Sequence, residues 1–218
     1  KNIPDGGYIM LLDFMEAIGQ LTLEEMNFVD NTGFTENGGL GIRIPAIDKL
    51  IFKNCNFIRT YNSGKHGGVF SVPISNPIGR DTGILFDNCY FEDNRVNENY
   101  CGGAIYINEI FESFEIDSCR FINSINNVAK VGGAIYIGNK LENTVSITNT
   151  NFTNIDALDN INDNGCAIFI QKGITCDIDV QRCIFLDCGT KGCVICTNCQ
   201  TFLFKNSTTI VLQYANLI

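Results

Sequence analysis

Apolar residues recur with a spacing of two in seven segments of this chain. The two columns of equivalent apolar positions are Leu21, Leu50, Ile84, Phe114, Val145, Ile178 and Phe202, followed by Leu23, Phe52, Phe86, Ile116, Ile147, Val180 and Phe204. A spacing of two places side chains on one face of a strand. The pattern predicts a short strand at the start of each of the segments 21–28, 50–57, 84–91, 114–121, 145–152, 178–185 and 202–209, and no segment has helical spacing.

Within each segment the alternation slips by one residue and then resumes. The inward columns after the slip are Met26, Cys55, Cys89, Cys119, Thr150, Cys183 and Ser207, then Phe28, Phe57, Phe91, Phe121, Phe152, Phe185 and Thr209. The residues at the slip are Asn54, Asn88, Asn149 and Asn206 in four segments, and Glu25, Ser118 and Arg182 in the others. Asn tolerates the left-handed conformation that a sharp corner requires. We therefore predict two short strands joined by a bend, with the Cys and Phe columns in the core.

A glycine pair, or a Gly-Cys pair, opens each repeat. The pairs are Gly6-Gly7, Gly38-Gly39, Gly67-Gly68, Gly102-Gly103, Gly132-Gly133, Gly165-Cys166 and Gly192-Cys193. The second glycines, Gly7, Gly39, Gly68, Gly103 and Gly133, are predicted to be coil-entry positions, because a missing Cβ admits both a hard turn and a close approach. After the second pair we expect a one-residue slip, which turns Leu40, Ile42 and Ile44 inward in place of Arg43.

The β-formers after each pair, as in CGGAIYI at 101–107, predict a third strand in every repeat. Repeats of this kind stack into a parallel β-helix, in which equivalent positions of successive coils lie ~4.8 Å apart. We predict an all-β, single-stranded parallel β-helix of about seven coils, with 27 to 35 residues per coil. We expect one domain over residues 1–218, a fragment of a longer chain, with open coil ends that can pair with neighbouring copies.

Charge and hydropathy exclude two classes of partner. The chain has 15 Lys and Arg against 24 Asp and Glu, a net charge of −9. Because this charge repels a phosphate backbone, nucleic acid is not expected as a partner. No stretch approaches the ~20 apolar residues of a membrane-spanning helix, so direct membrane insertion by this segment is not expected either. No motif predicts a cofactor.

Two short motifs indicate a family. GGAI at 102–105 and 132–135, together with FxxN at 28–31 and 91–94, resembles the repeat signature of chlamydial polymorphic membrane proteins and of some protist surface proteins. The resemblance implies a right-handed β-helix in a secreted or surface-displayed region. It leads us to expect a non-enzymatic, extracellular or cell-surface module, adhesin-like or structural, that contacts protein or glycan surfaces.

The alternative function is that of a carbohydrate-active enzyme, a polysaccharide lyase or glycosidase, because parallel β-helices also carry such activities on an outer strand face. Asp87 and Asp117 occupy one outward column in adjacent coils, with Lys53 and Arg120 nearby. Paired carboxylates with a base are the groups of such chemistry, and two carboxylates can also bind Ca²⁺. These four are weak catalytic candidates, because outward strand positions are polar in most sheets.

The 11 cysteines allow three interpretations. Cys55, Cys89, Cys119 and Cys183 are expected to pack as small buried apolar residues. The CxxCxxC at 193–199 leaves reduced packing, disulfides and zinc open, although no metal site is predicted there because one coil does not converge four sulfurs. Cys188, Cys196 and Cys199 are the disulfide candidates, since they lie off the inward columns.

Three surface features remain. Asn151-Phe152-Thr153 is a sequon whose Asn is expected to point outward, which makes Asn151 a candidate glycosylation site. His66 is expected to be solvated in a loop. Tyr106, Tyr136 and Phe169 are expected to form an outward stripe, which is either covered by loops or exposed as a binding surface.

Overall fold

The structure is a computed structural model of the chain. It describes residues 18–34, 38–40, 47–72, 82–110, 112–123, 129–141, 144–157, 167–171, 177–188, 195–197 and 201–210. Gly7, Ile42, Arg43, Ile44 and Cys199 lie outside the described residues. The described chain is all-β, and every pairing between its strands is parallel.

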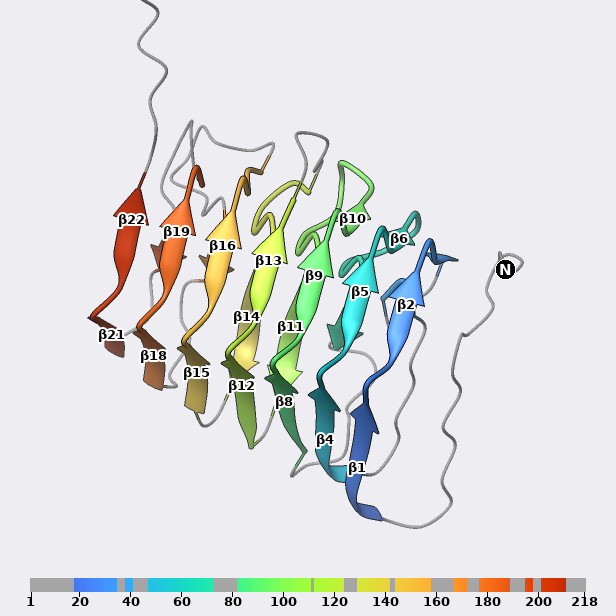
Figure 1. Ribbon diagram of the computed structural model, residues 1–218, viewed down its shortest axis with the longest axis horizontal. Coiled ribbons are helices and arrows are strands. Elements are labelled where there is room, and N and C mark those ends of the chain that lie inside the picture. The colour runs from blue at the N-terminus through green and yellow to red at the C-terminus, as the bar shows by residue number, and fades with distance from the viewer. Residues whose placement is uncertain are drawn as a thin grey trace, which may run out of the picture.

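The strands form three faces of a solenoid and one small additional sheet (Figure 1). The first sheet contains β1 (Ile18–Glu24), β4 (Ile47–Lys53), β8 (Gly83–Asp87), β12 (Ser113–Asp117), β15 (Thr144–Thr148), β18 (Asp177–Gln181) and β21 (Thr201–Lys205). The second sheet contains β2 (Asn27–Val29), β5 (Asn56–Ile58), β9 (Tyr90–Glu92), β13 (Arg120–Ile122), β16 (Asn151–Thr153), β19 (Ile184–Leu186) and β22 (Thr208–Ile210). The third sheet contains β7 (Phe70–Val72), β11 (Ile105–Ile110), β14 (Ile135–Leu141), β17 (Ile168–Ile170) and β20 (Ile195–Thr197). The small sheet contains β3 (Thr32–Gly33), β6 (Tyr61–Asn62) and β10 (Arg95–Val96).

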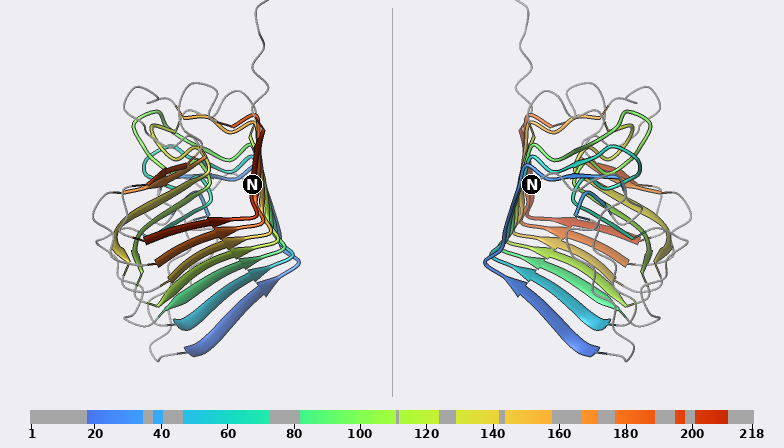
Figure 2. Two further views of the ribbon diagram at one scale, coloured as in Figure 1. Left: turned by 90° about the vertical axis from the view of Figure 1, so that its left-hand side faces the viewer. Right: turned by 90° about the vertical axis from the view of Figure 1, so that its right-hand side faces the viewer.

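Seen along the stack, the second sheet rises steeply from one edge of the first sheet. The third sheet lies across the core from the second sheet (Figure 2). This arrangement confirms the predicted parallel β-solenoid. The number of coils differs slightly from the predicted seven. The described strands form about four turns that have all three faces, between β7 and β20. The first and second sheets extend further, and each contains seven strands.

Register confirms the predicted core columns except near the ends of the stack, where Met26 and Phe204 are 38% and 42% exposed. The Phe column runs in register through the second sheet, from Phe28 to Phe57, Phe91, Phe121, Phe152 and Phe185 and then to Thr209. Consecutive rings are stacked, with centroids 4.3 to 5.2 Å apart. All six phenylalanines are buried, together with the first-sheet column of Leu50, Ile84, Phe114, Val145 and Ile178. Burial of these columns from coil to coil supplies the main stabilisation of the solenoid.

The bend between the first and second sheets adopts the left-handed conformation in every repeat. The residues with positive φ are Glu25, Asn54, Asn88, Ser118, Asn149, Arg182 and Asn206, which are the residues predicted at the slip. A second bend, which directly follows the second-sheet strand, was not predicted. It has positive φ at Asp30, Arg59, Asp93, Asn154 and Asp187.

The two glycines of each pair have separate roles, which corrects the prediction that the second one makes the turn. The first glycine has the positive φ: +91° at Gly38, +69° at Gly67 and Gly102, and +62° at Gly132. The second permits close stacking, because a Cβ on Gly39 would overlap the carbonyl oxygen of Gly68, the equivalent residue of the next coil. Leu40 is fully buried, as the expected slip requires.

The cysteine column is buried as predicted, and it also forms hydrogen bonds that the sequence analysis did not anticipate. The backbone N of Cys89 donates to Sγ of Cys119 in the next coil (3.3 Å), and the backbone N of Cys119 donates to Oγ1 of Thr150 (3.2 Å). Each thiol in turn donates to carbonyl oxygens at the end of the first sheet, as Cys119 does to Asp117 (3.2 Å) and Phe86 (3.4 Å). The column therefore requires a small side chain that both donates and accepts, which Cys, Thr and Ser provide.

We predict that Cys119→Ala lowers the free energy of unfolding by about 2 kcal/mol, because it leaves the buried N–H of Cys89 without its acceptor. Cys119→Ser is the matched control, since Ser207 fills the equivalent position and accepts from the backbone N of Cys183 (3.0 Å). Urea unfolding followed by circular dichroism measures both variants. Equal destabilisation of the two would show that the thiol acts only by filling space.

Candidate functional site

The predicted carboxylate pair lies in register, but its members have different surroundings. Asp87 and Asp117 are Cα partners at the ends of β8 and β12. Asp117 accepts hydrogen bonds from the Thr148 hydroxyl, from Nδ2 of Asn149 (2.6 Å) and from Oγ of Ser118 (3.1 Å). Burial acts to raise the pKa of Asp117, but these hydrogen bonds and the Arg182 charge together hold it below its usual value. Asp117 is therefore an ionised acceptor that ties its coil to the next one.

Of the two predicted bases, Lys53 lies beside this pair, as the Cα partner of Asp87 in the adjacent coil, but its ammonium is engaged elsewhere. Nζ of Lys53 lies 3.6 Å from Oε1 of Glu24, on the side of Lys53 that faces away from Asp117 along the stack. Arg120 lies beyond the bend, in β13, where its register partners are Tyr90 and Asn151. Within the part of the chain that the structure describes, no three His, Cys, Asp or Glu residues form a group that could hold a metal ion.

An open groove of about 520 Å³ follows the bend between the first and second sheets. Four consecutive coils line it with the same two positions. The residues at the bend are Asn54, Asn88, Ser118 and Asn149. The residues two positions later, at the start of each second-sheet strand, are Asn56, Tyr90, Arg120 and Asn151. We call this surface the corner groove; sequence analysis found its first row as a bend column but did not identify a groove.

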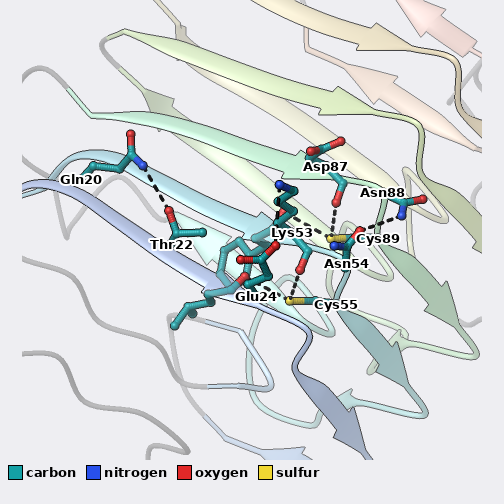
Figure 3. A network of polar contacts seen from close by, with 11 residues as sticks. Gln20, Thr22, Glu24, Lys53, Asn54, Cys55, Asp87, Asn88 and Cys89 are labelled. Atoms are coloured by element: carbon teal, nitrogen blue, oxygen red, sulfur yellow. Dashed lines mark hydrogen bonds and ion pairs between the residues drawn. The ribbon is translucent and has the colours of Figure 1, made fainter.

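Amide groups are linked along the corner groove from coil to coil. Nδ2 of Asn88 donates to Oδ1 of Asn54 at 2.7 Å (Figure 3), and Nδ2 of Asn56 donates to Oδ1 of Asn27 at 2.7 Å. A side-chain amide has two donor hydrogens and an acceptor oxygen with two lone pairs, so one such bond leaves hydrogen-bonding capacity on each residue. The linked amides therefore present a fixed row of donors and acceptors to a ligand.

Tyr90 and Arg120 occupy the middle of the corner groove. Arg120 is exposed, and the salt bridges found among the described residues, Lys49–Glu115, Lys53–Glu24 and Arg59–Asp30, do not include it. Burial, with a hydrogen bond and the charge of Glu92, raises the pKa of Tyr90, so its phenol is a neutral donor and acceptor. The centre of the groove thus combines one guanidinium with an aromatic ring.

The structure corrects the premise of the disulfide prediction. Cys188 is fully buried, and its Sγ donates to the carbonyl oxygen of Leu186 (3.4 Å), so it belongs to an inward column. Cys196 lies in β20 as the register partner of Phe169, and Cys199 lies outside the described residues. Cys188 takes part in no disulfide in the structure, whereas disulfides involving Cys196 and Cys199 remain predictions. Cys55, Cys89, Cys101, Cys119 and Cys183 have free thiols.

Asn151 is exposed on β16, as the sequon prediction requires, and it lines the end of the corner groove. Its modification remains a prediction. A glycan attached there would occupy part of the groove, because the side chain that carries it is one of the lining residues.

His66 is not solvated, contrary to the prediction. Its ring stacks on Tyr106 with centroids 4.1 Å apart, and its Nδ1 accepts a hydrogen bond from the backbone N of Cys101 (2.9 Å). Burial and the Lys65 charge lower the pKa of His66 to about 4, so the imidazole is neutral at physiological pH and keeps this acceptor. This contact could not be predicted from the sequence, because it joins loops of two different coils.

The aromatic stripe forms a continuous stack on the third sheet, in which Tyr106, Tyr136 and Phe169 follow one another at 4.7 and 5.3 Å. Loop residues cover one end of it: His66 stacks on Tyr106, which is only 8% exposed, and Tyr100 in turn meets the His66 ring edge-on. Tyr136 and Phe169 are half-buried, and the hydroxyl of Tyr136 is within 2.6 Å of Oε1 of Gln171. Of the two expectations for this stripe, coverage by loops therefore applies to Tyr106.

Comparison with known proteins finds no family model, no curated protein and no solved structure that matches this chain. None of the described residues forms a helix that is long and apolar enough to cross a membrane. The assignment of the fold as a parallel β-solenoid is therefore based on the strand pairing itself.

Proposed function

We propose that this chain is a non-enzymatic β-solenoid module that acts outside the cell or at its surface, adhesin-like or structural, by contacting protein or glycan. The corner groove is the observation that carries the proposal, because it repeats the same two polar positions over four coils. Solenoids present extended surfaces of this kind, and regularly spaced side chains suit binding to an extended partner. The resemblance of the GGAI and FxxN motifs to repeats of polymorphic membrane proteins supports the extracellular location.

The contacts of the carboxylates favour binding over catalysis. A general acid or base must be free to exchange a proton with its substrate. Asp117 instead accepts three hydrogen bonds from its own and the next coil, and Lys53 is paired with Glu24. Asp87 does not have the three side-chain hydrogen bonds that hold Asp117. The alternative of a polysaccharide lyase or glycosidase therefore depends on Asp87.

A retention assay that also measures cleavage tests the proposal. The chain is incubated with immobilised extracellular-matrix proteins, with whole cells and with a panel of polysaccharides that includes polygalacturonate. Bound protein is then quantified, and new reducing ends and unsaturated uronates are measured. We expect retention on at least one surface without cleavage of any polysaccharide. Asp87→Ala is expected to leave retention unchanged, since Asp87 does not line the corner groove. Asp117→Asn is used for the cleavage measurement alone, because Asp117 accepts hydrogen bonds from the groove residues Ser118 and Asn149.

Two results would contradict the proposal. Turnover that Asp87→Ala or Asp117→Asn abolishes would establish the enzyme alternative. Absence of retention on every surface, with a folded protein by circular dichroism, would remove the binding function.

A further inference from the structure

We infer that the corner groove binds a linear, uncharged glycan that lies along the coil stack with about one sugar ring per coil. This inference rests on the proposed function and names the ligand class of the same surface. It is drawn from the direction of the groove, from the chemistry of its lining and from the charges beside it.

The direction follows from the register. Tyr90 is the Cα partner of Asn56 on one side and of Arg120 on the other, and Arg120 is the partner of Asn151. Equivalent positions of parallel strands are ~4.8 Å apart, which is close to the length of one pyranose ring in an extended β-linked chain. A glycan parallel to the stack therefore meets the same two positions once per ring.

The chemistry of the lining suits hydroxyl groups. Sugar hydroxyls both donate and accept, and the amides of Asn54, Asn56 and Asn88 do the same. The amides hold one another in place through the bonds from Asn88 to Asn54 and from Asn56 to Asn27, so less conformational freedom is lost on binding. The half-buried ring of Tyr90 gives the apolar face of a sugar ring a surface to pack on.

Charge beside the groove disfavours an anionic glycan. Asp87 and Asp117 directly precede the bend residues on one side, and Glu92 ends β9 on the other. Lys53, which directly precedes Asn54, is paired with Glu24 (3.6 Å), and Nε of Arg182 donates to Oδ1 of Asn149 at the far end of the groove (2.6 Å). At the middle of the groove Arg120 is the cation beside these three carboxylates, so a uronate or sulfate chain would meet repulsion there. A guanidinium also donates to neutral hydroxyls, so Arg120 suits an uncharged chain as well.

The length of the polar lining sets the length of the ligand. Asn56, Tyr90, Arg120 and Asn151 come from four consecutive coils, and the next position of the same column is Ile184, which is exposed and apolar. The polar row therefore ends at β19. At the other end the column continues with Asn27, the partner of Asn56, but Asn27 does not line the groove and the bend residue of its coil is the acidic Glu25. About four sugar rings therefore fill the groove, and a fifth ring at that end meets Asn27 beside a carboxylate.

Calorimetric titration with oligosaccharides tests the inference. The probes are β-1,4-linked oligomers of glucose, mannose and N-acetylglucosamine with two to six rings, and oligogalacturonates of the same lengths. For at least one neutral series, affinity should increase with each ring up to about four and then stay constant. Arg120→Ala and Tyr90→Ala should each weaken that binding about tenfold, which corresponds to the loss of one or two hydrogen bonds or of a ring contact. Ile184→Ala is the matched control at the same column position, and it should bind as the unmodified chain does.

The inference is overturned if no neutral series binds, if oligogalacturonates bind more tightly, if affinity does not depend on length, or if Arg120→Ala and Tyr90→Ala bind normally. Circular dichroism and urea midpoints of all three variants identify any loss of binding that comes from unfolding. If the chain is retained on cells or matrix proteins but binds no oligosaccharide, only this inference fails. If it is retained on no surface, the proposed function fails as well.

Discussion

Replacing Phe91 with alanine is expected to lower the free energy of unfolding by about 4 kcal/mol, the cost of emptying a large core site. The ring is 1% exposed and stacks between Phe57, at 4.8 Å, and Phe121, at 4.3 Å. It also meets the edge of Phe86 at 5.5 Å. Its removal opens a cavity that three other rings line, and neighbouring backbone cannot collapse into it without breaking register. Urea unfolding followed by circular dichroism measures the change.

Phe91→Leu is the control for this prediction, because it keeps most of the volume and should cost about 1 kcal/mol. A loss below about 1 kcal/mol for Phe91→Ala would mean that the Phe column is not a central part of the core.

The second large effect is expected for Gly68→Ala, which should destabilise the fold by about 3 kcal/mol. A Cβ on Gly68 would overlap the carbonyl oxygen of Gly103 and would lie 2.7 Å and 2.8 Å from the backbone O and N of Arg95. All three atoms belong to the backbone of the next coil, so no side chain can move aside. The local separation of two coils must increase, and the hydrogen bond from the backbone N of Gly68 to the carbonyl of Gly102 (3.3 Å) weakens.

Gly19→Ala is the matched control, because Oδ2 of Asp48, at 3.8 Å, is the nearest atom to its added Cβ. This substitution is expected to stabilise the chain by about 0.5 kcal/mol, since alanine loses less backbone entropy on folding. The two Gly→Ala substitutions should therefore have opposite signs in the same unfolding experiment. Similar effects of both would contradict the close stacking of Gly68 on Gly103.

Much of the fold could be predicted from the sequence, because each coil repeats the same constraints. The Phe column, the Cys column and the bend residues are aligned by a spacing of two and one slip, and register preserves that alignment. The roles within the glycine pairs could also have been separated. All seven pairs retain the first glycine, whereas Cys166 and Cys193 replace the second, and only a positive φ requires glycine so consistently.

Other features depend on geometry that no single repeat contains. The second bend was missed although Asp30, Asp93, Asn154 and Asp187 are of types that tolerate a positive φ, because these residues stand at the start of segments that vary in length and are rich in Asp and Asn throughout. Thr150 and Ser207 in the cysteine column were a signal for hydrogen bonding, but burial alone explained Cys. The corner groove depends on the angle between two sheets, which alternation does not encode.

The glycine rows, the cysteine column and the corner groove all depend on successive coils stacking in register, which is the central claim about this chain. A double-mutant cycle on the Phe column measures that stacking directly. Phe91→Ala and Phe121→Ala, whose rings are 4.3 Å apart, should show a coupling energy of about 1 kcal/mol. Phe91→Ala and Phe185→Ala, which are separated by Phe121 and Phe152, should be additive within about 0.5 kcal/mol. Absence of coupling in the first pair, or equal coupling in both, would contradict the stacked register.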